Sequence, residues 1–184
     1  MKETHYFIAL IPKQDVCEEL TAFKNDFADR FGSKKALNVI PHITLKSPFR
    51  LPADDHDRLI DWFDNLYSSQ KPFELELKNF GTFNSHKNPV VYVEPVMNMS
   101  LYTLQNEILR SFKFSYPMHV HNSDKKFNPH ITIAYRDLTV EKFKEAWKEY
   151  KHKEYKASFA VDHFFLLQHD STKWNVIATR SLNN

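Results

Sequence analysis

The tetrapeptide Pro-His-Ile-Thr occurs twice in this chain, once with His42 and Thr44 and once with His130 and Thr132. Each copy opens an alternation of apolar and polar residues that is typical of a β-strand. Side chains alternate between the two faces of a strand, so the histidine and the threonine of each copy are expected to share one face. The isoleucine between them then points into the core, and the polar pair faces solvent or a cleft.

Two imidazoles and two hydroxyls would suit phosphodiester chemistry if the two copies face each other. A neutral imidazole can deprotonate an attacking water and an imidazolium can protonate a leaving oxygen, because the ordinary pKa of histidine, ~6.5, lies near neutral pH. The threonine hydroxyls can donate hydrogen bonds to the non-bridging phosphate oxygens. By alternation Lys46 and Arg136 share the polar faces of the two strands and can add positive charge there. Such a mechanism needs no metal ion.

The first half of the chain predicts five elements around its tetrapeptide. Apolar residues from Val16 to Phe31 recur at steps of three and four, which is typical of one face of an amphipathic helix, and Gly32 closes that helix. Short runs rich in β-branched and aromatic residues predict the strands. The expected order is a strand at 5–12, a helix at 13–31, a strand at 36–49, a helix at 54–67 and a strand at 73–80.

The second half repeats this order. The expected elements are a strand at 89–96, a helix at 101–112, a strand at 127–136 that carries the second tetrapeptide, a helix at 140–150, and strands at 158–168 and 173–182 that form a hairpin. A single His-x-Thr is usually structural, but two copies at corresponding places in a repeated pattern indicate a shared function. An internal duplication explains the repeat.

The predicted fold class is therefore α+β. We expect a bilobal molecule with a pseudo-two-fold internal duplication, in which two antiparallel β-sheets face a central cleft and the helices lie outside. No linker rich in glycine, serine or proline divides the chain, so residues 1–184 are expected to form one domain. Its lobes would span approximately 1–80 and 89–184, and strand exchange between them is the alternative arrangement.

The paired His-x-Thr motifs on strands of a duplicated chain resemble those of the 2H phosphoesterase superfamily, which holds the 2′-5′ RNA ligase-like proteins and the RNA 2′,3′-cyclic phosphodiesterases. The resemblance extends over nearly the whole chain in element order. It implies a metal-independent enzyme that opens or hydrolyses 2′,3′-cyclic phosphates or 2′-5′ linkages, with ligation as the reverse direction. It also implies that His42 and His130 are the acid–base pair and that Thr44 and Thr132 bind phosphate, and it adds no cofactor. The alternative is a non-catalytic module that binds a nucleotide or RNA end in the same cleft.

Composition excludes several other classes. The two glycines are too few for a P-loop or a dinucleotide-binding fingerprint, and the net charge of +2 is too small for a general nucleic-acid binder. The single cysteine, Cys17, allows no intrachain disulfide. The apolar run near the N-terminus is too short for a signal peptide or a membrane span, so we expect a cytoplasmic protein with no membrane partner. A monomer is the expected state.

Two further sets of residues are candidates for lesser roles. Phe49, Tyr135 and Tyr6 are the aromatic residues that we expect to stack on a substrate base, the first two because they adjoin the motifs. His119 and His121 form His-x-His, which on a strand would place two metal-binding imidazoles on one face. No spacing suggests a third ligand, so we expect no metal site and place these histidines nearer the cleft instead.

Overall fold

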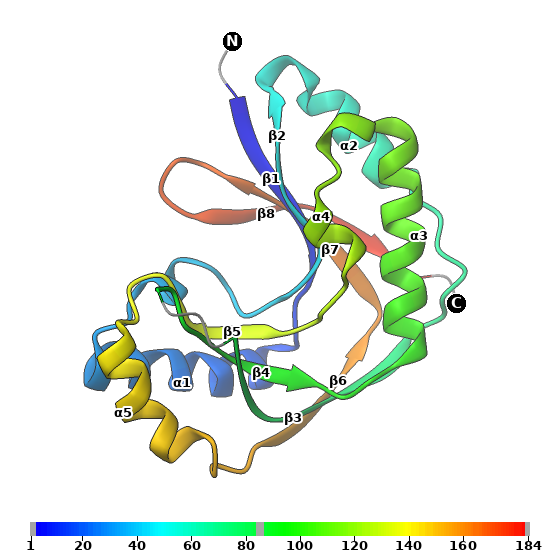
Figure 1. The fold of residues 1–184 in the computed structure, drawn as a ribbon. Coiled ribbons are helices and arrows are strands. Elements are labelled where there is room, and N and C mark those ends of the chain that lie inside the picture. The colour runs from blue at the N-terminus through cyan, green and yellow to red at the C-terminus, as the bar shows by residue number, and fades with distance from the viewer. Residues whose placement is uncertain (1–2, 84–86, 183–184) are drawn as a thin grey trace.

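The computed structural model describes residues 3–83 and 87–182. Within these residues the chain forms two antiparallel sheets of four strands each, with strand orders β2-β1-β7-β8 and β5-β4-β3-β6 (Figure 1). The first sheet contains β1 (Glu3–Leu10), β2 (Ile43–Pro52), β7 (His163–His169) and β8 (Trp174–Ser181), and the second contains β3 (Phe73–Phe83), β4 (Val90–Pro95), β5 (Ile131–Ala134) and β6 (Lys156–Val161).

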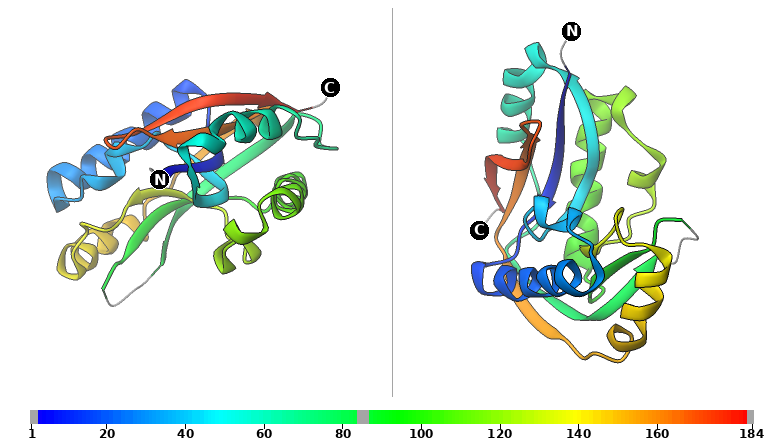
Figure 2. Two further views of the ribbon diagram at one scale, coloured as in Figure 1. Left: turned by 90° about the horizontal axis from the view of Figure 1, so that it is seen from above. Right: turned by 90° about the vertical axis from the view of Figure 1, so that its left-hand side faces the viewer.

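Helices cover the outer faces of both sheets (Figures 1 and 2). α2 packs on β8 and α3 on β2 of the first sheet, whereas α1 packs on β5 and β6 of the second sheet and beside α5. The helices are α1 (Gln14–Phe31), α2 (His56–Asp64), α3 (Met99–Ser115), α4 (Asn122–Lys125) and α5 (Val140–Tyr150), with short 3₁₀ turns η1 (Lys35–Asn38), η2 (Ala53–Asp55) and η3 (Pro117–His119). The predicted α+β fold with two antiparallel sheets is confirmed.

The helix α1 shows how the apolar spacing becomes structure. Val16, Leu20, Phe27 and Phe31 lie on its buried face. Gly32 ends it with a φ of 74°, in the left-handed region that glycine enters without steric cost, and donates its backbone N–H to the carbonyl of Phe27. The chain then turns back toward β2, the strand that begins directly after His42.

The two sheets are not built from contiguous halves of the chain. β3 pairs with β4 and β6 of the second sheet, and β7 pairs with β1 of the first. Boundaries at 1–80 and 89–184 therefore do not coincide with the sheets. The arrangement still has an internal correspondence: β2 is the edge strand beside β1, and β5 is the edge strand beside β4. Each tetrapeptide thus leads into an edge strand at an equivalent place.

One connected apolar core draws side chains from both sheets and from the helices that cover them. A smaller cluster of Phe7, Ala9 and Leu167 lies apart from it, on the opposite face of the first sheet. In β1, Tyr6, Ile8 and Leu10 enter the main core, while the alternate residues Phe7 and Ala9 form the small cluster. The first sheet therefore has apolar side chains on both of its faces.

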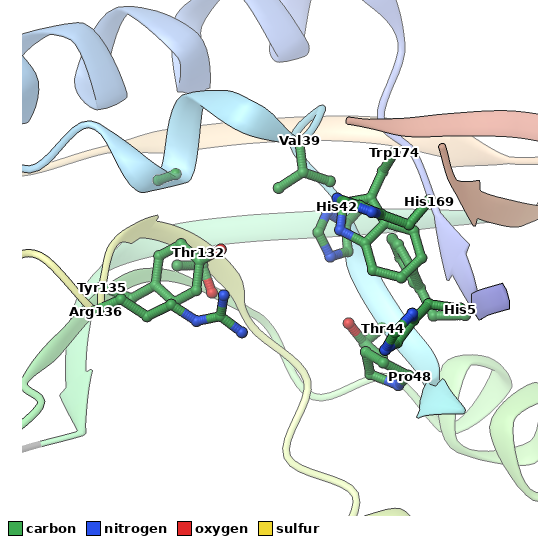
Figure 3. A pocket seen from close by; sticks show the side chains of 12 residues that line it. His5, Val39, His42, Thr44, Pro48, Thr132, Tyr135, Arg136, His169 and Trp174 are labelled. Atoms are coloured by element: carbon green, nitrogen blue, oxygen red, sulfur yellow. The ribbon is translucent and has the colours of Figure 1, made fainter. Parts of the chain in front are cut away.

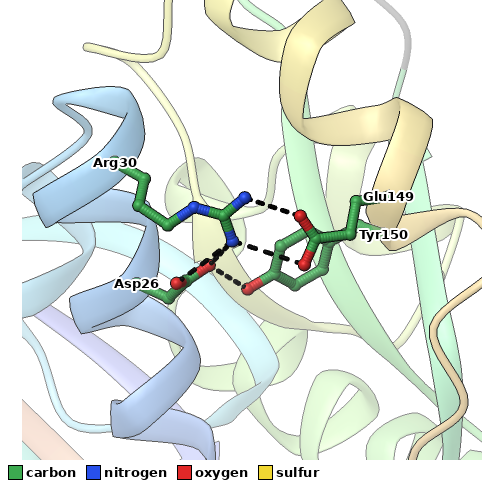
Figure 4. Close-up of polar contacts among 4 residues, drawn as sticks. All are labelled: Asp26, Arg30, Glu149 and Tyr150. Carbon is green, nitrogen blue, oxygen red and sulfur yellow. Dashed lines mark hydrogen bonds and ion pairs between the residues drawn. The ribbon is translucent and has the colours of Figure 1, made fainter.

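Polar contacts on the surface also join distant parts of the chain. Arg30 of α1 contacts Glu149 of α5, with 2.6 Å between Nη2 and Oε2, and the hydroxyl of Tyr150 donates to Asp26 at 2.7 Å (Figure 4). The charged groups are partly exposed, so the ion pairs add little to stability. Their consequence is mainly geometric, because they set α1 against α5. Of the helices in the described part of the chain, none is long and apolar enough to cross a bilayer.

Candidate active site

A cavity of about 350 Å³ lies between the two edge strands that follow the tetrapeptides. His42 and Thr44 line it from the β2 side, and Thr132, Tyr135 and Arg136 line it from the β5 side (Figure 3). The volume is at the lower end of the range for small-molecule sites. Among the described residues that line this cavity none is acidic. The arrangement suits an anionic ligand.

The two histidines are held in the same way. Nδ1 of His42 lies 2.7 Å from the carbonyl oxygen of Ile40, and Nδ1 of His130 lies 2.8 Å from that of Asn128. A carbonyl can only accept a hydrogen bond, so Nδ1 carries the proton in both rings. In the neutral state each Nε2 therefore has a lone pair that can accept a proton.

Burial lowers the pKa of both histidines. The pKa of His42 falls to about 4 because of burial, with smaller contributions from the charges of Lys24 and His130, while the hydrogen bond to Ile40 opposes the change. The pKa of His130 is also lowered by burial, against the hydrogen bond to Asn128. Both imidazoles are therefore mostly neutral at pH 7 without ligand.

Aromatic rings form the wall behind each histidine. The ring of Phe7 lies 4.8 Å from that of His42, and the rings of Phe83 and Tyr92 lie 4.9 and 5.4 Å from that of His130. Tyr92 crosses over Gly81 on the neighbouring strand, where an added Cβ would collide with the tyrosine ring. Glycine at this position therefore lets Tyr92 reach His130. His130 itself is only partly exposed and does not line the cavity.

Arg136 and Tyr135 follow directly after β5. Arg136 has a φ of 58°, and its guanidinium carbon lies 5.1 Å from the centre of the Tyr135 ring. The next residue, Asp137, accepts hydrogen bonds from the Ser33 hydroxyl at 3.0 Å and from the backbone N–H of Lys34 at 2.8 Å. This carboxylate ties the turn that carries Arg136 to the loop that leads to His42.

A buried lysine of α1 donates hydrogen bonds to the same loop. The side chain of Lys24 is 2 % exposed, and its Nζ donates to the carbonyl oxygens of Ala36 at 3.0 Å and Val39 at 2.9 Å. Burial lowers the pKa of Lys24 to about 8. Both accepting residues line the cavity, as does His42 a few positions later. Lys24 thus positions one wall of the site.

Lys46, the expected phosphate ligand of the first motif, lies in the core instead. It is 0 % exposed, and its Nζ lies 3.1 Å from Oδ2 of Asp124. The pairing of β1 with β2 shifts register between Ile8 and Ala9, so that Thr44 and Lys46 face consecutive residues of β1. An extra residue of this kind reverses the alternation of faces. Thr44 therefore faces the cavity while Lys46 points the other way.

Asp124 of α4 is the centre of a small buried network. Besides Lys46, it accepts hydrogen bonds from the backbone N–H and hydroxyl of Ser47 and from the backbone N–H of His121. Burial opposes ionisation, but these donors and the lysine charge hold the pKa of Asp124 below its ordinary value. The network joins β2 to the segment that precedes the second tetrapeptide.

Two of the three expected base-stacking residues are core residues. Phe49 is 2 % exposed and packs between Tyr6 and Phe112, with ring centres 5.9 and 4.7 Å apart. Tyr6 is fully buried, and its hydroxyl is 3.0 Å from Nδ1 of His56. Phe49 falls on the face opposite Thr44, where alternation over five residues also places it, because the two register shifts between them cancel. Only Tyr135 of this set lines the cavity.

His119 and His121 do not lie on a strand. His119 ends the turn η3, and His121 is the residue directly before α4. Within residues 3–83 and 87–182 no group of three or more histidine, cysteine or acidic side chains could hold a metal ion. Neither histidine lines the cavity.

The cavity also includes residues that the motifs do not indicate. Some of them lie on the face of the first sheet that carries the small apolar cluster, and the others lie on the loop before His42. They are His5, Phe7, Ala36, Val39, Pro48, His169 and Trp174. Alternation in β1 places His5 on the face of Phe7. The contribution of β7 and β8 depends on the pairing of β7 with β1, which the sequence pattern does not reveal.

Comparisons with known proteins agree with this geometry. Similar proteins include one from Staphylococcus epidermidis named "Putative phosphoesterase", 25% identical over 177 residues, which cover 95% of this chain and 97% of that protein. A Bacillus cytotoxicus protein of the same description is 28% identical over 156 residues, which cover 84% of this chain and 86% of its own length. Both relatives match this chain over most of their length.

Solved structures show the same fold. Escherichia coli LigT complexed with 3′-AMP superposes with a TM-score of 0.72 at 18% identity, over 100% of both chains. TT0787 of Thermus thermophilus gives a TM-score of 0.68 at 17% identity, over 97% of both chains. The family model of the 2′-5′ RNA ligase superfamily matches residues 12–173, which include both tetrapeptides. The chain therefore belongs to the 2′-5′ RNA ligase superfamily, a group of 2H phosphoesterases.

Proposed function

We propose that the protein is a metal-independent phosphodiesterase that hydrolyses 2′,3′-cyclic phosphates, on RNA ends or nucleotides, or 2′-5′ linkages. The observation that carries the proposal is that His42 and His130 have the same tautomer, because the Nδ1–H group of each donates to a main-chain carbonyl. His42 lines a cavity with two threonine hydroxyls and one arginine, and His130 lies two residues before Thr132 of that lining. Such a set can move protons on both sides of a phosphorus atom.

The proposed reaction on a cyclic phosphate uses one histidine as base and the other as acid. Nε2 of the first takes a proton from water as the water oxygen bonds to phosphorus. Nε2 of the second, protonated, gives its proton to the ribose oxygen whose bond to phosphorus breaks. The product is a ribose phosphate monoester, and the pair has exchanged its protonation states. The same steps in reverse, with a ribose hydroxyl as nucleophile, give ligation.

The remaining cavity groups act on the charge of the phosphate. The hydroxyls of Thr44 and Thr132 reach it from opposite walls, and Arg136 adds a permanent positive charge. These donors lie at the cavity wall, where they can stabilise charge that develops on the non-bridging oxygens. Because one chain supplies both motifs, the mechanism requires no second protomer.

The bound states of a structural neighbour support a nucleotide substrate. Escherichia coli LigT has been crystallised with 3′-AMP, with ATP, with phosphate and with NADP⁺. The first is a nucleoside 3′-monophosphate, one of the two products that opening of a 2′,3′-cyclic nucleotide would give. We propose the same ligand class for this chain.

The test is incubation with 2′,3′-cyclic AMP followed by phosphorus NMR, which reports turnover and the position of the product phosphate. Substituting either histidine, His42→Ala or His130→Ala, is expected to lower kcat by about 10²- to 10⁴-fold, the usual contribution of general acid–base catalysis. His152→Ala is the matched control, because His152 is exposed beyond the end of α5. Melting temperatures of all three variants check that each is folded.

Other outcomes separate the alternatives. Full activity in both histidine variants would refute the proposal. Binding of 2′,3′-cyclic AMP without product after long incubation would identify a non-catalytic nucleotide-binding module. A large loss of activity with EDTA would show that a metal ion takes part. RNA with a free 5′-hydroxyl, supplied together with RNA that ends in a cyclic phosphate, would reveal ligation as a longer product.

A further inference from the structure

The cavity has a second group of polar and aromatic residues that the proposed reaction does not use. His5, His169 and Trp174 line it from the first sheet, beyond His42 and on the side opposite Tyr135 and Arg136 (Figure 3). They come from β1, the end of β7 and the start of β8. Tyr135 on the other wall is the aromatic side chain available to the nucleoside at the reacting phosphate. Trp174 lies on the opposite wall and is therefore free to contact a different part of the ligand.

The tryptophan is fixed in place before any ligand binds. Its ring lies 4.6 Å from Phe7 and 5.0 Å from His169, with interplanar angles of 82° and 68°. Trp174 and His169 face each other across the β7–β8 hairpin. A rigid aromatic side chain loses little conformational entropy when a base stacks on it.

The hairpin turn itself is held by one carboxylate. Asp170 accepts hydrogen bonds from the backbone N–H of Thr172 and Lys173, each at 2.8 Å, and from the side chain of Asn175 at 2.7 Å. These hydrogen bonds hold the pKa of Asp170 well below its ordinary range. The turn therefore positions the pair His169 and Trp174 at the edge of the cavity.

His169 differs from the two motif histidines in the nitrogen that carries the proton. Its Nδ1 accepts a hydrogen bond from the backbone N–H of Ser171 at 3.2 Å. In the neutral ring the proton must then lie on Nε2, so His169 offers a donor where His42 offers an acceptor. The ring centres of His5 and His169 are 6.5 Å apart, and His5 is the residue opposite Arg50 in the β1–β2 pairing. The two histidines suit a phosphate or an acceptor atom of a base.

We infer that His5, His169 and Trp174 form a second nucleotide subsite, which holds the neighbour of the nucleotide that carries the reacting phosphate. The inference rests on the proposed function, because the subsite extends the same cavity. A base stacks on Trp174, and His5 and His169 contact the adjoining phosphate or base edge. The preferred substrate is therefore at least a dinucleotide, and a cyclic mononucleotide fills only part of the site.

The test compares kcat/KM for three substrates: 2′,3′-cyclic AMP, the 3′-5′ dinucleotide ApA that ends in a 2′,3′-cyclic phosphate, and 2′-5′-linked ApA. Stacking of one base predicts that a dinucleotide is preferred about tenfold over cyclic AMP. Trp174→Ala is expected to bring that ratio close to one, and His169→Ala to lower it about threefold. Val176→Ala is the matched control, because this exposed residue lies on the same strand outside the cavity lining.

The outcomes decide the inference in either direction. If the cyclic-ended dinucleotide is preferred and the preference depends on Trp174, the second nucleotide lies upstream of the reacting one. If instead the 2′-5′ dinucleotide is preferred in this way, the second nucleotide lies across the scissile bond. Equal kcat/KM values in the wild-type protein, or an unchanged ratio in Trp174→Ala, would refute the subsite. If no substrate is turned over, the proposed function fails by itself. Equal dissociation constants of the wild-type protein for 3′-AMP and ApA 3′-phosphate would then refute the subsite, and tighter dinucleotide binding that Trp174→Ala removes would support it.

Discussion

The two tetrapeptides begin alike and diverge after the threonine. In both, the histidine Nδ1 is held by the carbonyl two residues earlier, and the threonine faces the cavity from an edge strand. The following cations have different places: Lys46 is buried against Asp124, and Arg136 lines the cavity. The comparison teaches that the duplication keeps the groups proposed for proton transfer and phosphate binding, while the segments after them have separate tasks.

The electrostatic surroundings of the two histidines also differ. Lys24 supports the loop before His42 and contributes to lowering its pKa, whereas no such cation acts on His130 among the shifts resolved for the described residues. His130 packs instead against Phe83 and Tyr92. The two rings have the same tautomer but not the same affinity for a proton. That asymmetry suits a pair in which one member is base and the other acid.

The largest expected effect comes from exchanging the two cations for neutral side chains. Lys46→Met leaves the buried carboxylate of Asp124 without its counter-charge, and we expect a loss of about 3–5 kcal/mol in the free energy of unfolding. Arg136→Gln is expected to leave that free energy nearly unchanged and to lower kcat/KM about tenfold, because an exposed cation at the phosphate is lost. Urea unfolding and steady-state kinetics on the folded fraction measure both quantities.

One result would contradict this difference between Lys46 and Arg136. If Lys46→Met lowered kcat/KM as strongly as Arg136→Gln and left the unfolding midpoint unchanged, Lys46 would act as a phosphate ligand. The duplication would then extend two residues beyond the threonine.

The threonines test the part that the two copies share. Thr44→Val and Thr132→Val keep the shape of the side chain and remove the hydroxyl donor, and each is expected to lower kcat about 10²-fold, as loss of one oxyanion donor does. Thr103→Val, on α3 and outside the cavity lining, is the control and should retain wild-type kcat. A loss in only one of the two cavity variants would show that a single threonine contacts the phosphate.

The smallest expected effect is in the pH dependence. A base must be neutral and an acid protonated, so kcat/KM of the free enzyme rises through the lower histidine pKa and falls through the higher one. With the pKa of His42 at about 4 and that of His130 below 6.5, the maximum should lie below pH 6.5 and the rate should fall toward pH 8. Kinetics with 2′,3′-cyclic AMP between pH 3.5 and 8.5 measure this profile.

The same pKa shifts predict a stability change with a definite sign. Because both folded-state values lie below the unfolded value of ~6.5, the unfolded chain binds more protons as pH falls from about 6.5 to 4, and the folded state loses stability in that window.

Lys24→Gln removes a positive charge that lowers the pKa of His42 and not that of His130. We therefore expect the limb of the kcat/KM profile that follows the pKa of His42 to shift to higher pH. A profile that does not change in this variant would contradict the asymmetry.

Much of the site could be predicted from the sequence because it depends on local alternation. The pairs His42 with Thr44 and His130 with Thr132 need only a strand in which every second side chain shares a face. Tyr135 and Arg136 follow β5 closely and reach the same cavity. Lys46 could not be placed this way, because the shift in register between it and Thr44 becomes visible only when β2 pairs with β1.

The sequence by itself determined most of the element order and the two His-x-Thr pairs, because periods of two and 3.6 residues and a repeated tetrapeptide are local properties of a chain. It predicted one strand at 158–168, where the structure has β6 and β7 in different sheets. Only the tertiary structure decided which strands share a sheet. β3 joins the second sheet and β7 the first, so His169 and Trp174 come to the cavity from the far end of the chain. Pairing between distant strands depends on which apolar faces can be buried together, and no short stretch of sequence records that choice.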